Sequence, residues 1–146
     1  MELIMDYSKL ADEFLQHMYM MRKFKPQKKI NESMQGETMA LYHIAYHGRH
    51  IIPSEISDVT GISCARIAAT LNSLEKKGYI TRQIDQSDRR RILITLTEKG
   101  KQQEQESRRE LIETIEKMLM QLGEHDAREY IRLTHKIAKL ANVDQE

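Results

Sequence analysis

The sequence predicts a mainly α-helical protein with a small β-wing, a winged helix-turn-helix flanked by helices from both chain ends. Two observations lead to this prediction. From Pro53 to Gly100 the residues read as a short helix, a glycine turn, a second helix, a strand, an arginine-rich loop and a returning strand. On both sides of this segment, apolar residues recur at the spacing of an amphipathic helix.

The first element is predicted as a helix over residues 2–24, where apolar side chains recur every three or four positions. Pro26 ends this pattern, because proline lacks a backbone N–H and disfavours helix in the residue before it. The basic run from Arg22 to Lys29 is therefore expected to form a loop. A second helix is expected to follow Gly36 and to end at Gly48. Its apolar members are Met39, Tyr42, Ile44 and Tyr46.

The central segment opens with the signals of a strand and a short helix. Residues 51–52 predict a short strand that adds to the sheet of the wing. Ser54 is expected to cap the following helix, and Glu55 in its first turn suits the positive end of the helix dipole. Ile56 and Val59 are expected to face inward.

A second helix of this segment is expected to begin at the cap Ser63 and to run to Lys77. Gly61 permits the sharp turn between the two helices, and Gly78 stops the second one. At 100° per residue, one narrow face is apolar and carries Ile67, Leu71 and Leu74. The opposite face combines small with hydrogen-bonding side chains, as a groove-reading helix requires. Its members and edge residues are Ala65, Arg66, Ala69, Asn72, Ser73 and Lys76.

Two strands are predicted over residues 79–84 and 91–97 from their alternating apolar side chains, and the loop between them forms the wing. Arg89 and Arg90 at the tip of this thin hairpin suit the minor groove of DNA, whose negative potential favours arginine. We interpret Asp88 as a partner that orients a neighbouring arginine. The alternative interpretation is a cluster of surface salt bridges.

Thr97 is expected to cap a long helix from Glu98 to about Leu122, which Gly123 ends, and a last helix is expected over residues 126–141. Amphipathic helices at opposite chain ends favour packing together and against a symmetry mate. The expected organisation is an N-terminal dimerisation helix with a basic loop, a winged helix-turn-helix and a pair of C-terminal dimerisation helices. These regions cover residues 1–35, 36–101 and 102–146.

The composition of the 146 residues favours a cytoplasmic protein. Cys64 is the only cysteine, which excludes an intramolecular disulfide. The N-terminus lacks the basic and apolar regions of a signal peptide, and no apolar run approaches the roughly 18 residues that span a bilayer. The net charge of +1 gives no argument for nucleic acid, although cations gather locally. No catalytic motif is present, so neither an enzyme nor a cofactor is expected.

Three motifs carry a resemblance to a known family. They are LEKKGYI at residues 74–80, DQSDRR at 85–90 and LTEKG at 96–100. In these motifs, their order and their spacing, the chain resembles the MarR family of bacterial and archaeal transcription regulators. The match is specific over residues 54–101, and elsewhere it depends on helix layout and length.

The resemblance implies a sequence-specific DNA-binding regulator, a repressor that binds a pseudo-palindromic operator in double-stranded DNA as a homodimer. The helix from Ser63 to Lys77 then matches the recognition helix. Arg90 matches the minor-groove arginine of the wing, and Asp88 matches the acid that steadies the wing. Many members release DNA when a small amphipathic ligand binds between the dimer lobe and the DNA lobe. Candidate pocket residues are Phe14, Met18, Tyr42 and Tyr46.

Three alternatives stay open. His43 and His47 stand at the i, i+4 spacing that chelates a metal from one helical face, which favours a zinc-responsive regulator of the same fold. Cys64 at the start of the recognition helix is either a redox switch or merely a small residue at the DNA interface. A winged helix that docks another protein through its wing and basic run is the alternative from a different class.

Overall fold

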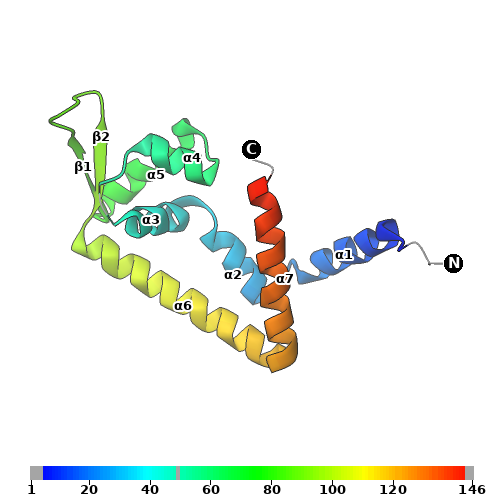
Figure 1. Ribbon diagram of the computed structural model, residues 1–146. Coiled ribbons are helices and arrows are strands. Elements are labelled where there is room, and N and C mark those ends of the chain that lie inside the picture. Colours follow the sequence, from blue (N-terminus) through cyan, green and yellow to red (C-terminus); the bar gives the residue numbers. More distant parts are fainter. Residues whose placement is uncertain (1–4, 49, 144–146) are drawn as a thin grey trace. The chain divides into compact units, whose positions relative to one another are not determined.

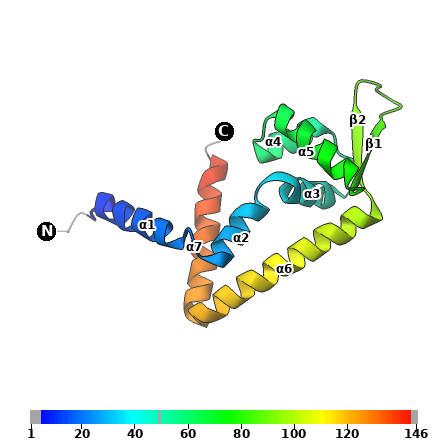
Figure 2. The ribbon, with the colours of Figure 1, turned by 180° about the vertical axis from the view of Figure 1, so that it is seen from behind.

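The computed structural model describes residues 5–48 and 50–143. The chain divides into two compact units, Met1–Arg109 and Glu110–Glu146. Figures 1 and 2 present the helices and the hairpin from opposite sides. Helix α6, Glu98–Leu122, begins in the first unit and ends in the second. The expected boundary between residues 101 and 102 lies within this helix.

Two helices, not one helix and a loop, form the N-terminal region. Helix α1 spans Tyr7–Met21, and helix α2 spans Lys25–Ser33. The expectation of a basic loop from Arg22 to Lys29 was therefore wrong from Lys25 onward, whereas residues 22–24 do form a turn between the two helices. Pro26 lies in the first turn of α2, where its missing N–H costs no hydrogen bond and its fixed φ suits the helix. Residues 2–4 of the predicted helix lie outside the described residues.

Helix α3, Gly36–His47, ends at Gly48 in the left-handed conformation with φ +64°, as predicted. Ala40, Leu41 and Ile44 are its buried residues. Tyr42 and Tyr46, which the sequence places among the apolar members of this helix, are exposed and stack on each other with ring centroids 6.0 Å apart. The core accepts the smaller aliphatic side chains because α3 packs closely against both α5 and β2.

Helix α4, Pro53–Thr60, begins one residue before the expected cap Ser54. Its N-cap is Ile52, whose backbone N–H donates to the Glu55 carboxylate at 2.9 Å. Ile56 is fully buried as predicted, but Val59 is 62% exposed. Gly61 then adopts φ +67° and turns the chain into helix α5, Cys64–Lys76. The predicted helix-turn-helix is confirmed.

Strands β1, Ile80–Ile84, and β2, Ile92–Leu96, form the predicted antiparallel hairpin. Their register pairs Ile80 with Leu96 and Ile84 with Ile92. The predicted third strand is reduced to a single bridge between Ile51 and Ile94. Ile80 and Ile94 are buried, whereas Ile84 and Ile92 are exposed near the tip of the hairpin. The hairpin therefore projects beyond the core, as Figure 1 shows.

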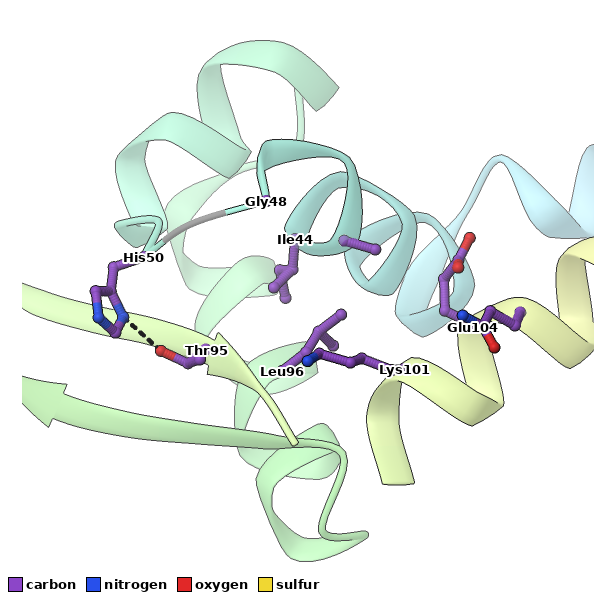
Figure 3. Close-up of a pocket in the computed structure, with 9 residues that line it drawn as sticks. Ile44, Gly48, His50, Thr95, Leu96, Lys101 and Glu104 are labelled. Carbon is purple, nitrogen blue, oxygen red and sulfur yellow. Dashed lines mark hydrogen bonds between the residues drawn. The ribbon is translucent and has the colours of Figure 1, made fainter. Parts of the chain in front are cut away.

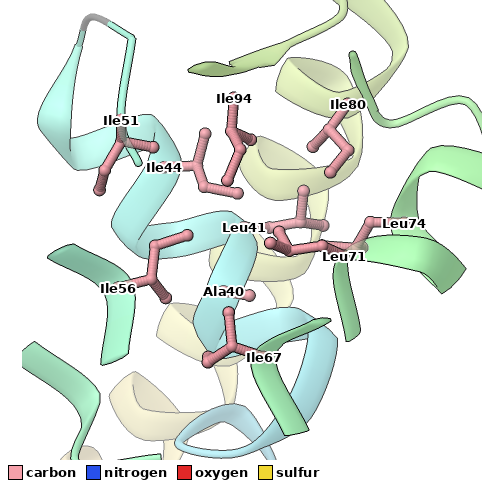
Figure 4. Packing of buried hydrophobic residues seen from close by; sticks show 10 residues of the cluster. All are labelled: Ala40, Leu41, Ile44, Ile51, Ile56, Ile67, Leu71, Leu74, Ile80 and Ile94. Carbon is pink, nitrogen blue, oxygen red and sulfur yellow. The ribbon is translucent and has the colours of Figure 1, made fainter. Parts of the chain in front are cut away.

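One aliphatic core holds α3, α4, α5 and the hairpin together (Figure 4). Every member is an alanine, leucine or isoleucine, so the core positions the surface elements without a buried charge among the described residues. The buried side chains are those of Ala40, Leu41, Ile44, Ile51, Ile56, Ile67, Leu71, Leu74, Ile80 and Ile94.

Helix α6 ends at Gly123, which adopts φ +80°, and α7 follows over Glu124–Val143. Both helices are confirmed, with α7 starting two residues earlier than predicted. Among its residues whose side chains are described, α7 buries none. Its exposed large apolar side chains are Tyr130, Ile131, Leu133, Ile137 and Leu140. Within the described residues, no helix combines the length and the apolar character that crossing a bilayer requires.

Candidate nucleic-acid interface

Helix α5 has one buried face and one exposed face. Ile67, Leu71 and Leu74 are buried, as predicted, and fix the helix to α3, α4 and β1. Five of the predicted DNA-reading residues are exposed on the other side: Ala65, Arg66, Ala69, Asn72 and Lys76. A rigid helix that offers small and polar side chains in this way can bring them close to base edges in a major groove.

The start of α5 is capped by Ser63, whose hydroxyl accepts a hydrogen bond from the Arg66 backbone N–H at 3.4 Å. Ser63 is exposed, so the N-terminal end of the helix and its dipole face solvent. Such an end attracts a phosphate. Cys64 is also exposed, and its Sγ lies 3.7 Å from the Ser57 hydroxyl of α4.

Ser73 differs from the other predicted contact residues. It is half-buried, and its hydroxyl donates to the Glu37 carboxylate of α3. Lys77 donates to the other oxygen of Glu37 at 2.6 Å. Ser73 and Lys77 therefore tie α5 to α3, which is a scaffold role that sequence reasoning did not assign to Ser73.

Replacing Glu37 with Gln is expected to lower stability at neutral pH. The hydrogen bonds from Lys77 and Ser73 hold the pKa of Glu37 below its ordinary value. A carboxyl with a lowered folded pKa stabilises the fold above its unfolded pKa, and this contribution is lost as pH falls through the folded pKa. We expect the variant to lose about 1 kcal/mol of unfolding free energy at pH 7 and to match the parent under strongly acidic conditions.

Urea unfolding of both proteins between pH 7 and pH 3 measures this difference. Glu32→Gln is the matched control, because Glu32 lies 3.9 Å from Lys28 on the exposed surface of α2 and joins no second element. A Glu37→Gln protein as stable as the parent at pH 7 would contradict the scaffold role.

A second polar network involves Arg82 of β1, which sequence reasoning missed as a site residue. Its guanidinium donates to both oxygens of Glu75, at 3.0 and 3.1 Å, and to the Asn72 side-chain oxygen at 2.8 Å. The sequence contains a signal for this role, because the two-residue period of a strand places Arg82 on the same side as Ile80. A charged residue on that side of a strand needs a partner on the neighbouring element.

The wing is ordered by two carboxylates. The Asp85 carboxylate accepts hydrogen bonds from the Ser87 hydroxyl and backbone N–H, which lower the pKa of Asp85. Asp88 accepts from the backbone N–H of Arg90 at 3.1 Å and from its Nε at 3.3 Å. The Arg90 side chain is nevertheless 92% exposed. Asp88 thus holds the Arg90 backbone and the Nε edge of its guanidinium, while most of the side chain is open to solvent, and Arg89 is exposed beside it.

The four residues suggested for a ligand pocket do not line the cavity that lies beside β2. Phe14, Met18, Tyr42 and Tyr46 are all exposed. The cavity has a volume of about 590 Å³ and lies between the end of α3, strand β2 and the start of α6. Ile44 and Leu96 give it apolar walls, and His50 Nδ1 lies 2.5 Å from the Thr95 hydroxyl beside it (Figure 3).

The two histidines suggested as metal ligands lie on α3 beside the tyrosines. Burial lowers the pKa of His43. The His43 ring lies edge-on to the Tyr42 ring, with the two ring centroids 5.4 Å apart. His47 Nε2 lies 4.0 Å from the Glu55 carboxylate. Across residues 5–48 and 50–143, no group of three His, Cys, Asp or Glu side chains is placed to hold a metal ion.

Comparison with known proteins finds similarity to transcription regulators. A model described as the MarR family matches residues 34–91. YwhA of Bacillus subtilis (strain 168), described as an uncharacterised HTH-type transcriptional regulator, is 28% identical over 144 residues, which cover 92% of this chain and 100% of YwhA. YwaE of the same organism carries the same description and is 25% identical over 89 residues, 54% of this chain.

The match spans only about half of YwaE, at 52% of its length. The fold is also similar to a solved structure. The crystal structure of a MarR transcriptional regulator from Methanosarcina mazei Go1 aligns with a TM-score of 0.67 at 24% identity, over 94% of this chain and 99% of that chain. The mainly helical architecture with a two-stranded wing is therefore that of a solved winged-helix regulator.

Proposed function

We propose that this chain, which belongs to the MarR family of winged-helix, DNA-binding transcription regulators, is a ligand-responsive repressor that binds a pseudo-palindromic operator as a homodimer. The observation that carries the proposal is the pairing of an exposed polar face on α5 with an arginine-tipped wing on the same core. The family is one of regulators and not of enzymes.

In this proposal α5 enters the major groove. Arg66 suits the acceptor edge of guanine, and the methyl groups of Ala65 and Ala69 suit the thymine methyl group. Lys76 and the helix start at Ser63 suit backbone phosphates, which position the protein without selecting bases. Ser73 contributes indirectly by holding α5 on α3 through Glu37.

The wing enters the adjacent minor groove with Arg90, assisted by Arg89. Asp88 stays on the protein side and orients Arg90 through its backbone N–H and the Nε of its guanidinium. Two such half-interfaces are needed for high affinity, because a chain with a net charge of +1 makes few phosphate contacts alone.

Exposed apolar side chains support the homodimer. In the first unit, α1 exposes Tyr7, Leu10 and Phe14, and in the second unit α7 exposes Ile137 and Leu140. Amphipathic helices with such faces are stable in water when a partner covers them. A twofold dimer presents two recognition helices to two half-sites of inverted sequence.

The cavity beside β2 supports a ligand response. Its volume of about 590 Å³ lies in the range that holds a small organic molecule, with apolar walls and polar groups such as Lys101 and Glu104. Because β2 is one strand of the wing, a ligand there acts on an element that we assign to DNA binding. The zinc-responsive alternative lacks such support, since the described residues group no three metal ligands.

Selection of bound sequences from a random DNA pool, with a salt titration, tests the proposed function. We expect an enriched inverted repeat with half-sites about one helical turn apart. The logarithm of the binding constant should fall linearly with the logarithm of salt concentration. A protein that enriches no sequence and binds no DNA at low salt would contradict the proposal and favour the protein-docking alternative. Sedimentation of the same sample measures the homodimer.

A further inference from the structure

Arg82 fixes the orientation of the Asn72 side chain. Asn72 and Glu75 lie three residues apart and therefore share one side of α5, and Arg82 approaches that side from β1. The Arg82 Nη2 donates to the Asn72 Oδ1 at 2.8 Å and to the Glu75 Oε1 at 3.0 Å. The Arg82 Nε donates to the other Glu75 oxygen at 3.1 Å. One guanidinium thus joins both side chains.

The chemistry of this contact permits only one orientation of the amide. A guanidinium carries donors and no acceptor, so it binds the carbonyl oxygen of Asn72 and repels its NH2 group. The oxygen is therefore directed to Arg82, and the two N–H donors are left to face outward. Arg82 itself is held by a bidentate pair with Glu75, a geometry that fixes direction as well as distance.

This orientation matters for base reading. An asparagine that recognises adenine uses both ends of its amide, because its oxygen accepts from the N6 amino group while its nitrogen donates to N7. Because the oxygen is directed at Arg82, the NH2 group is the end of the Asn72 amide that is left to meet a base edge. Guanine presents two acceptors, O6 and N7, in the major groove, and is the base whose edge matches two donors.

We propose that Arg82 is a positioning residue that sets the base specificity of the recognition helix, by holding the Asn72 oxygen on the protein side so that its NH2 group meets the base and selects guanine over adenine. This inference depends on the proposed function, because it requires α5 to lie in the major groove. The simpler alternative is that Asn72 pairs with adenine through both ends of its amide.

The role of Glu75 follows from the same geometry. Hydrogen bonding to Arg82 lowers the pKa of Glu75, and the same contact raises the pKa of Arg82, so both groups stay charged at neutral pH. Glu75 neutralises Arg82 and holds it against α5. Arg82 is therefore engaged with the helix and is not a phosphate contact.

The test selects bound sequences from a random pool with four proteins. Asn72→Ala identifies the operator position that Asn72 reads, since preference relaxes there. The double variant Arg82→Met with Glu75→Gln frees the amide without leaving an unpaired carboxylate beside DNA. Glu75→Gln alone is the matched control, because it keeps the Arg82 contact with Asn72. At the operator position that Asn72 reads, we expect a preference for guanine in the parent and in Glu75→Gln. In the double variant we expect the preference to shift about tenfold toward adenine.

A second measurement uses the unaltered protein. An operator with adenine at the Asn72 position is compared with one that carries purine, which lacks the 6-amino group. Equal binding is expected, because the Asn72 oxygen is directed at Arg82 and not at that group. Binding that is tenfold tighter to adenine would overturn the inference even if the double variant failed to fold.

The outcomes separate this inference from the proposed function. If the parent enriches an operator, three results would overturn the role of Arg82 alone. They are a preference for adenine in the parent, an unchanged base preference in the folded double variant, and the absence of a relaxed operator position in Asn72→Ala. A parent that enriches no sequence at all overturns both.

Discussion

Replacing Gly100 with Ala is expected to be the most destabilising single-methyl change in the chain. A Cβ at this position would lie 2.0 Å from the backbone oxygen of Tyr79 and 3.1 Å from Leu96 Cδ2. The obstacle is backbone that also accepts the Thr97 N–H at 3.0 Å, so it cannot rotate away as a side chain can. The start of α6 would have to move off the end of α5 and the hairpin.

The sign of the change in stability separates the effect of this close contact from the effect of helix propensity. In an open helix, Gly→Ala stabilises by about 1 kcal/mol, because alanine is the better helix former. Overpacking against a fixed neighbour costs roughly 3 kcal/mol at the upper end of its usual range, which corresponds to a fall in Tm of roughly 6–12 °C. Thermal unfolding measures this fall in Tm, with Gln102→Ala on the exposed side of α6 as the control. A Gly100→Ala protein more stable than the parent would show that α6 starts farther from Tyr79.

The sequence predicted the elements whose patterns are local. The spacing of Ile67, Leu71 and Leu74 predicts one buried helical face, and the structure buries all three. Gly61 predicts a turn because its position requires a left-handed conformation, and it adopts φ +67°. Such signals can be read from single sequences because each is decided within one or two helical turns.

Helix α2 and the inward face of α3 could not be read in this way. Pro26 is compatible with both the end and the start of a helix, and its neighbours determine which. Helix α3 has apolar residues on several sides, so its periodicity does not tell Leu41 from Tyr42. Only the tertiary packing decides that Leu41 is buried and that Tyr42 stacks on Tyr46 outside.

The polar contacts of the candidate site depend on residues far apart in the chain. Ser73 is 36 positions from Glu37, and Arg82 is 10 positions from Asn72. Residue types on a helical wheel indicate which side chains are exposed, but they do not indicate which hydrogen-bonding atoms are already occupied. The face of α5 was therefore predictable, whereas the donor and acceptor groups that it offers were not.

Replacing Arg90 with Ala is expected to weaken binding to nearly all DNA sequences, not to change base preference. The Arg90 guanidinium is exposed at the wing tip, while Asp88 holds its backbone N–H and Nε. Arginine in a narrow minor groove responds to groove shape and potential, which many sequences share. Loss of a contact of about 1–3 kcal/mol raises Kd by roughly 5- to 150-fold.

Titration with salt separates this role from a general loss of charge. Removing one cation from the DNA interface reduces the salt slope by about one per wing, so we expect a smaller slope for Arg90→Ala on the selected operator. Arg128→Ala is the charge-matched control, because Arg128 lies on α7, pairs with Glu124 at 3.0 Å and has no place in the proposed interface. If Arg90→Ala matched the parent in both affinity and slope, the wing would have no part in DNA binding. If both alanine variants weakened binding equally, the effect would come from net charge and not from the groove contact of the wing.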